Sequence, residues 1–354
     1  MIQFGYFQST EPAQSICKPI LSRIEFGLLF DYILYWEVGV PPADLHIHDN
    51  QLARTTKMDG IPIRADVLFT NDKGEENVRI QKRSEKTLRK LRPALQRLLL
   101  PDEAVLYVMP ARSPLSSLEQ LTAAWWTSIL AASTIMLTNK RILFFPVKQD
   151  GSWKESVRAV QWGDLEEVKP NGLLVRNVSF KFRNDSKITY TNIRRADAKK
   201  IAAIAHRLIP AGSGEVSSTQ GLIQLCPDCR NVLTQGQYFC SGCGLIFKNE
   251  KRMVTRSILL PGGGYFYTGH PLVAMIPAVV EGLLVLEILS LLVAASTSAK
   301  AMPNIRSGLL ILGLFWAIET AVTILHCRRY VRDFIPEKRD PARAHQDLTA
   351  KVGG

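Results

Sequence analysis

The sequence predicts a multidomain α+β protein: a small β-barrel-like domain capped by a helix, then a four-cysteine β-hairpin, then a two-helix transmembrane hairpin. Three observations predict this order. They are short β-branched and aromatic runs in the middle of the chain, two close pairs of cysteines, and two long apolar stretches near the carboxyl end. The chain has 354 residues, which at ~100–200 residues per domain indicates two or three folding units. Its mean hydropathy of +0.02 is too low for a polytopic transporter.

Changes in composition divide the chain into successive parts. The predicted boundaries are 1–78 for a region of unassigned fold, 79–97 for a basic amphipathic helix, 98–210 for the β-rich domain, 211–223 for a linker, 224–247 for the cysteine module, 248–270 for a juxtamembrane glycine- and aromatic-rich segment, 271–326 for the transmembrane hairpin and 327–354 for a basic cytosolic tail.

Two apolar stretches, Pro271–Ala295 and Ser307–Leu325, are long enough to cross a bilayer core of about 30 Å. Basic residues precede and follow the pair, whereas the link Ser296–Arg306 holds only two. The positive-inside rule therefore places both ends in the cytoplasm and the short link outside. The alternative is a pair of buried core helices in a soluble domain, which seldom run so long without a polar face.

Three carboxylates lie inside these stretches, at Glu281, Glu287 and Glu319. An ionised carboxylate in the bilayer costs about 2.5–3.5 kcal/mol on insertion scales, so each is expected to be protonated or paired. Together they are a candidate intramembrane polar site. Glu281 and Glu287 are six positions apart and so share no helical stripe, which favours the simpler interpretation that such groups join helices by hydrogen bonds.

Cys226, Cys229, Cys240 and Cys243 form two CxxC pairs separated by ten residues. Two such turns supply four thiolates to a tetrahedral Zn²⁺, and Gly244 suits the left-handed backbone that the turn requires, whereas a redox motif needs only one pair. Four sulfur ligands leave no open position, so the predicted zinc is structural. Residues 224–247 resemble the zinc ribbon family of β-hairpin modules, which implies a fold and no particular ligand.

The segment Pro261–His270 combines glycines with aromatic residues just before the first apolar stretch. It resembles the PGxGxxYxG lead-in that precedes a membrane hairpin in many uncharacterised bacterial proteins. Glycines permit a sharp turn, and Tyr265, Phe266 and Tyr267 are expected to anchor the chain at headgroup depth. The glycine spacing differs from a phosphate-binding fingerprint, so nucleotide binding is not predicted here.

Between Leu98 and Pro210, short β-branched and aromatic runs alternate with turn signals. A helix is predicted at Ala196–Leu208 from its apolar periodicity. Several strands followed by one helix indicate a small, partly open barrel capped at one end. The predicted strands are Ala104–Met109, Ser133–Leu137, Arg141–Pro146, Val157–Trp162, Leu173–Val175, Asn177–Arg183 and Lys187–Asn192.

The sequence LTNKRILFF at Leu137–Phe145 is similar to a strand pair of bacterial pleckstrin-homology-like (GRAM-type) domains. The order also agrees, since an amphipathic strand element near Trp162–Val168 precedes a hairpin and the final helix. The resemblance covers about a third of the chain and implies a protein-interaction or oligomerisation module, without implying lipid binding. Lys140 and Arg141 either contact anionic headgroups or, more simply, belong to a solvated turn. The apolar run from Trp125 to Ala132 departs from the family's pattern.

Residues 79–97 carry eight basic side chains against Glu85 alone, with leucines along one helical stripe. Beside a membrane, such a helix would lie on the anionic leaflet. The candidate contacts are Lys82, Arg83, Lys86, Arg89 and Lys90. The alternative is a connector helix whose leucines dock on the next domain. No aromatic residues alternate with the cations, so a stacking platform for single-stranded nucleic acid is not supported.

The first 78 residues are harder to interpret. Phe26–Trp36 is predicted as a buried helix, and Ile61–Phe69 with Asn77–Ile80 as a hairpin. His46 and His48 form an HxH pair, but the other histidines lie far along the chain, so isolated histidines are favoured over a metal site. The sequence contains neither a GxSxG elbow nor a Walker-type phosphate loop.

These features favour a non-enzymatic adaptor or scaffold of the bacterial inner membrane, multi-pass, with both termini cytoplasmic. Its expected partners are membrane lipid and a protein, either another chain or a second copy. The formal net charge of +12 suits anionic partners in general. Nucleic-acid or regulatory binding through the cysteine module and residues 79–97 is an alternative that is not favoured. An oligomeric ion or proton pathway through the three glutamates is a second alternative.

Overall fold

The computed structural model describes residues 55–116, 119, 131–172, 176–210, 221–297 and 302–337. Four features expected from the sequence lie outside these residues. They are the helix at 26–36, the His46/His48 pair, most of the apolar run that begins at 125, and the strand at 173–175.

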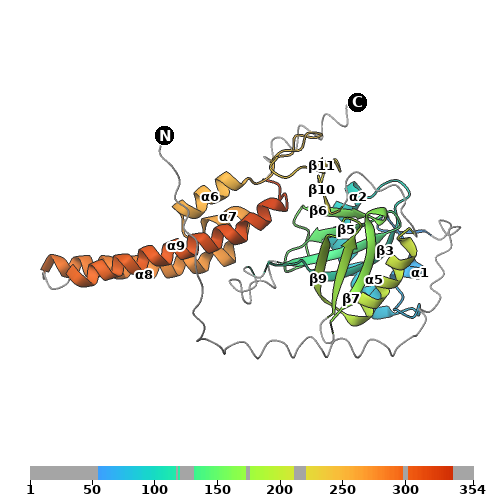
Figure 1. Cartoon of the computed structure of the whole chain (residues 1–354), viewed down its shortest axis with the longest axis horizontal. Coiled ribbons are helices and arrows are strands. Elements are labelled where there is room, and N and C mark those ends of the chain that lie inside the picture. The colour runs from blue at the N-terminus through green and yellow to red at the C-terminus, as the bar shows by residue number, and fades with distance from the viewer. Residues whose placement is uncertain are drawn as a thin grey trace, which may run out of the picture. The chain divides into compact units, whose positions relative to one another are not determined.

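A curled, largely antiparallel sheet is the centre of the molecule (Figure 1). Its strand order is β11-β10-β6-β5-β4-β3-β9-β8-β7. The predicted β-barrel-like fold is confirmed as a half-barrel, and β7 lies where the family resemblance placed an amphipathic strand. The strands are β3 (Val105–Arg112), β4 (Ala132–Thr138), β5 (Arg141–Pro146), β6 (Val157–Gln161), β7 (Leu165–Asn171), β8 (Arg176–Phe182), β9 (Lys187–Ile193), β10 (Ile223–Leu225) and β11 (Val232–Leu233).

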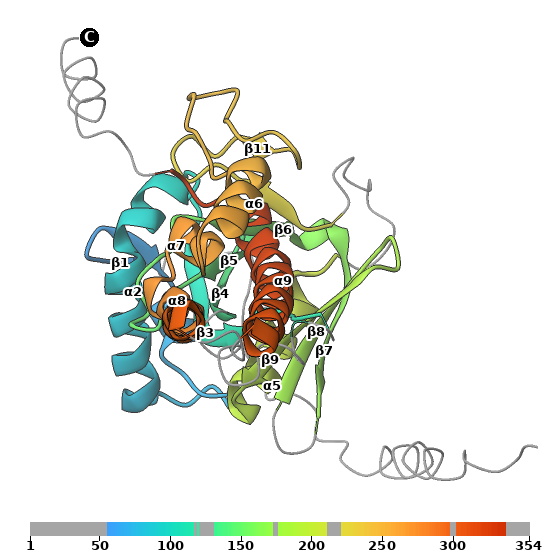
Figure 2. The same cartoon turned by 90° about the vertical axis from the view of Figure 1, so that its left-hand side faces the viewer.

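Strands β3 to β6 are buried on both faces, because a helix covers each side. Side chains alternate along a strand, so in β5 Ile142 and Phe144 enter the core beneath α5 (Arg195–Leu208), whereas Leu143 and Phe145 enter a second core. That second core lies under α2 (Val78–Leu98), which runs along one side of the sheet (Figure 2). The leucine stripe of α2 is fully buried there, as the docking alternative expected.

The segment before α2 differs from the predicted hairpin. β1 (Thr56–Met58) pairs with β2 (Ile61–Ile63) through an Asp59-Gly60 turn with positive φ at both residues. β2 then pairs parallel with β3, and α1 (Ala65–Leu68) follows. Asn77 is not in a strand, because its side chain accepts hydrogen bonds from two backbone N–H groups and begins α2. An Asp-Gly pair between two short strands is a hairpin signal, and it explains why the hairpin turns at Asp59-Gly60.

Buried ionic groups connect the elements of this domain. The carboxylate of Glu103 accepts hydrogen bonds from Arg141 Nε at 2.9 Å and from Thr138 Oγ1 at 2.8 Å. The ammonium group of Lys200, on α5, reaches Val67 O at 2.6 Å and also donates to Thr70 O. Arg141 therefore lies neither in a solvated turn nor at a surface, since only 4% of it is exposed.

The carboxyl-terminal part is helical. α6 (Glu250–Leu259) and α7 (Gly263–Thr268) precede α8 (Pro271–Thr297) and α9 (Met302–Arg332), which form a hairpin (Figure 1). α8 and α9 are both long and apolar enough to cross a membrane, over Pro271–Val293 and Arg306–Arg332, with mean hydropathies of 2.3 and 2.0. Only 22% and 11% of their most apolar windows are buried by the rest of the chain. They therefore expose apolar surface, which the core helices of a soluble protein do not.

Candidate functional site

The four predicted cysteines lie together. Their Sγ atoms are all within 4.8 Å of one another. The Sγ atoms of Cys226 and Cys243 are 3.5 Å apart, and those of Cys229 and Cys240 are 3.4 Å apart. A disulfide needs about 2.05 Å, whereas Zn–S bonds of about 2.3 Å in a tetrahedron place sulfurs about 3.8 Å apart. The sulfur positions therefore fit a Zn²⁺ ion, with all four cysteines as its ligands.

The two CxxC turns have matching geometry. Backbone N–H groups two and three residues on point at the first sulfur of each pair, from Asp228 and Cys229 to Cys226 and from Gly242 and Cys243 to Cys240. The residue after each pair is left-handed, with φ of 66° at Arg230 and 72° at Gly244. The expected conformation of Gly244 is confirmed, and Arg230 adopts it despite its Cβ.

Without a metal ion, the thiols of Cys226 and Cys243 do not ionise readily. Burial raises the pKa of Cys226 well above its ordinary value and the pKa of Cys243 to about 11. Burial also acts on Cys240, but hydrogen bonds from the backbone of Cys243 and Gly242 outweigh it and lower that pKa. A metal ion binding here must displace protons, so metal affinity falls as the pH falls.

The cysteine module contacts both neighbouring parts of the chain. On one side β10 extends the sheet by pairing with β6, with Leu225 opposite Val157. On the other side Phe334, just after α9, enters the module's small core beside Phe247. The ring centroids of Phe334 and Phe247 are 5.6 Å apart. The backbone N–H of Lys248 donates to Ile335 O at 3.0 Å. The module therefore links the sheet to the end of the helical hairpin.

The three glutamates of the hairpin are not brought together as one site. Glu281 is 4% exposed, and its carboxyl group is close enough to that of Glu319 for the two to interact electrostatically. Glu319 accepts hydrogen bonds from Thr323 Oγ1 at 2.6 Å and from the backbone of Gly262 at 3.3 Å. Glu287 is exposed on the outer side. Glu319 thus connects α9 to the turn before α7, whereas Glu281 Oε1 is buried without a hydrogen-bond partner among the described residues and Glu287 does not take part.

The aromatic segment is mostly internal. Tyr265 is buried, and its hydroxyl group contacts His326 Nδ1 at 2.5 Å. Tyr267 is also buried and donates to Glu337 at 3.0 Å. Phe266 is 46% exposed. Anchoring of this segment at headgroup depth stays a prediction. Of the three aromatic residues, only Phe266 is exposed enough to contact the headgroups.

The cations of α2 are divided between two roles. Arg83 points into the domain, with 2.8 Å between its Nη2 and Asp197 Oδ1, and Asp197 also accepts from the hydroxyl group of Tyr107 at 2.6 Å. The sequence alone did not identify this pair, because its members lie 114 positions apart. Of the five predicted contacts, the other four are exposed: Lys82, Lys86, Arg89 and Lys90. Contact of these four with an anionic surface stays a prediction.

Comparison with known proteins finds a likeness for the sheet domain. Residues 99–206 match the family described as "Bacterial PH domain". The C-terminal domain of an unknown protein from Leishmania infantum has 11% identity and a TM-score of 0.23, covering 37% of this chain and 99% of that one. The Vps36 N-terminal PH domain has 16% identity and a TM-score of 0.24, covering 32% and 83%. No curated protein matches the chain.

The family match begins at residue 99, after α2, and ends inside α5, so it covers the sheet and its capping helix. The four-cysteine cluster and the two apolar helices lie beyond it. Residues 99–206 of this chain are therefore similar to the bacterial PH domain family, and a four-cysteine module and a helical hairpin follow them.

Proposed function

We propose that the protein is a membrane-anchored adaptor without catalytic activity, in which the helical hairpin crosses the cytoplasmic membrane and the PH-like domain binds a protein partner. A PH-like domain suggests an interaction role, and the exposed apolar surface of α8 and α9 supports insertion. Basic residues at both ends of the hairpin favour a cytosolic position for the sheet domain.

In this proposal, the four-cysteine module holds the sheet domain to the hairpin. The observation that carries it is that one small core contains residues from the module together with Phe334 from the end of α9, while β10 of the same module extends the sheet. A module of this size has too little core to be stable alone, so bound Zn²⁺ would supply much of its folding free energy. The zinc would therefore act as a structural joint.

Membrane fractionation tests the anchor. The full chain is expected to remain in the membrane pellet after an alkaline carbonate wash, and a variant lacking residues 271–332 is expected to become soluble. Release of the full chain by carbonate would overturn the proposal, because peripheral proteins leave the membrane under these conditions and spanning helices do not.

Topology labelling tests the orientation. A single cysteine introduced between residues 296 and 306 should react with an impermeant thiol reagent from outside the cell. One introduced at Lys199, on the exposed side of α5, should react only after permeabilisation. Labelling of both positions from the same side would contradict a hairpin that spans the bilayer.

A further inference from the structure

Of the three glutamates in the helical hairpin, Glu287 faces outward. It lies inside the span Pro271–Val293, and its side chain is exposed. Leu283 and Leu286 beside it are 62% and 63% exposed, so this surface meets hydrocarbon once the hairpin is inserted. Within the described part of the chain, no residue pairs with the carboxylate of Glu287. A carboxylate in hydrocarbon is costly, and such groups almost always face another helix, so Glu287 needs a partner from outside the chain.

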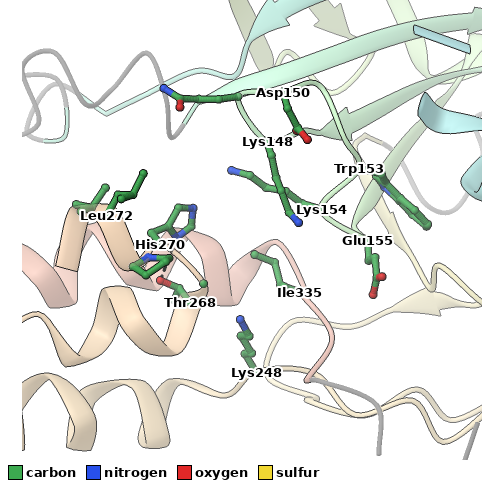
Figure 3. Close-up of a pocket in the computed structure, with 14 residues that line it drawn as sticks. Lys148, Asp150, Trp153, Lys154, Glu155, Lys248, Thr268, His270, Leu272 and Ile335 are labelled. Atoms are coloured by element: carbon green, nitrogen blue, oxygen red, sulfur yellow. Dashed lines mark hydrogen bonds between the residues drawn. The ribbon is translucent and has the colours of Figure 1, made fainter. Parts of the chain in front are cut away.

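The other end of the hairpin already has neighbours within the chain. His270 and Leu272, at the start of α8, line a pocket of about 510 Å³ whose opposite wall is the loop between β5 and β6 (Figure 3). Lys154 of that loop also lies over the ring of Tyr330, with its Nζ 5.3 Å from the ring centroid. The surface left for another protein is therefore the part of the hairpin nearer the link between α8 and α9, where Glu287 lies.

Helix α9 carries an exposed arginine at nearly the same depth. Arg306 begins the second span and has no acidic partner within the described part of the chain. Gly308 is level with Ile288 and Leu291 of α8, because a Cβ on it would lie 3.5 Å and 3.7 Å from their side chains. With a rise of about 1.5 Å per residue, Arg306 is then about 7 Å from Glu287 along the hairpin axis. An arginine side chain is long enough to cross such a distance along apolar surface.

A second copy of the chain presents the same groups at the same depth. All copies insert with one orientation, and rotation about the membrane normal preserves depth, so Arg306 of a neighbouring copy lies level with Arg306 of the first.

The apolar side chains agree with this register. Ala317 is about three helical turns after Arg306 and so lies on the same side of α9, while Val280 is about two turns before Glu287 on the same side of α8. Counting from Gly308 places Ala317 level with Val280, and both are exposed. A small residue opposite a larger one allows two membrane helices to approach closely.

We propose that copies of this chain associate within the membrane, with Glu287 on α8 of one copy forming an ion pair with Arg306 on α9 of the next. The inference rests on the membrane insertion proposed above. It adds a partner, which is a second copy of the same chain, and an interface that lies in the hairpin and not in the PH-like domain. The ion pair offsets the cost of placing Glu287 in hydrocarbon.

Charge exchange tests the pair. Full chains that carry a donor or an acceptor fluorescent protein at the N-terminus are reconstituted together into phosphatidylcholine vesicles, and energy transfer is measured as added lipid dilutes the protein. Arg306→Gln is expected to weaken association about five-fold. Arg332→Gln, which changes an exposed arginine at the other end of α9, should leave it unchanged. Glu287→Arg and Arg306→Glu should each weaken association, because like charges then meet, and the chain carrying both changes should regain it.

The outcomes separate this inference from the membrane anchor. Equal energy transfer for Arg306→Gln and Arg332→Gln would overturn the inference, and so would a double exchange that stays as weak as the single ones. Arg306→Glu reports on the pair even if Glu287→Arg fails to insert, because Arg306 lies at the end of its span. An unchanged chain that resists carbonate but shows no energy transfer contradicts self-association alone, whereas release by carbonate contradicts the anchor.

Discussion

At the residue scale, a buried ion pair stabilises the PH-like domain. Glu103 is fully buried, and its carboxylate accepts from Arg141 at 2.9 and 3.0 Å and from the backbone of Leu100 at 2.7 Å. Arg141 also donates to Leu98 O at 2.7 Å, the last residue of α2. The ion pair thus connects the end of α2 to the β4–β5 turn, and each partner depends on the other to offset its desolvation.

Replacing Glu103 by alanine is expected to lower the free energy of unfolding by about 3–5 kcal/mol, because the Arg141 charge would remain buried without its partner. The matched control is Glu166→Ala, which breaks an exposed pair with Lys181 at 2.8 Å and should cost less than about 1 kcal/mol. Thermal unfolding of the purified full chain in detergent measures both. Similar losses in the two variants would contradict this account.

The buried side chain of Lys200 is expected to make the free energy of unfolding depend on pH. Burial lowers its pKa from 10.5 to about 7, against an opposing effect of Asp197. Between these pH values the unfolded chain holds a proton that the folded chain lacks, so stability rises with pH across that window. Below pH 7 both states are protonated and the contribution is constant. Lys200→Met should remove this slope in a plot of Tm against pH, whereas Lys199→Met should retain it.

At the scale of elements, close approach of helices organises the base of the hairpin. α7 is a six-residue helix that begins after Gly262, whose φ is +63°. It contacts α6 and α9, and its residue Gly264 lies against Ser257 and Thr323. The glycines therefore do more than permit a turn, because they allow three helices to meet without side chains between them.

Gly264→Ala is expected to destabilise the hairpin base by about 1–3 kcal/mol, since a Cβ would overlap the side chains of Ser257 and Thr323 and lie 3.2 Å from Cys327 Sγ. Gly313→Ala is the matched control on α9, because a Cβ there meets nothing within 4 Å. A lowered Tm in the first variant alone is the expected result. An unchanged Tm for Gly264→Ala would show that α7 and α9 are not in contact.

At the scale of the whole molecule, the cysteine module connects a sheet that folds around its own core to helices that expose apolar surface. Besides the Phe334 contact, Asp333 is an ion-pair partner of Arg158 on β6, and its backbone oxygen accepts from Gln224 at 2.9 Å. These contacts converge where the module, the sheet and the end of α9 meet. Loss of the metal should therefore be felt on both sides of the module.

Cys240→Ser is expected to abolish zinc binding and to increase amide hydrogen exchange at two places, in β10 and at residues 335–337, where Glu337 N donates to Ile246 O at 3.0 Å. Exchange in β4 and β5 should not change. Ser241→Ala, on an exposed neighbour, should keep one zinc per chain and normal exchange. Loss of zinc without faster exchange at 335–337 would contradict a metal-dependent joint.

The sequence by itself determined the elements whose signal is local. The strands from β3 to β6, the helix α5, the cysteine turns and the apolar hairpin follow from periodicity, turn residues and the CxxC spacing, which act within a few positions. Only the tertiary structure decided that α2 covers the second face of the sheet, that Arg83 meets Asp197 and that Phe334 enters the cysteine module. These contacts join residues far apart in the chain, and packing selects such partners through shape and charge that no single segment carries.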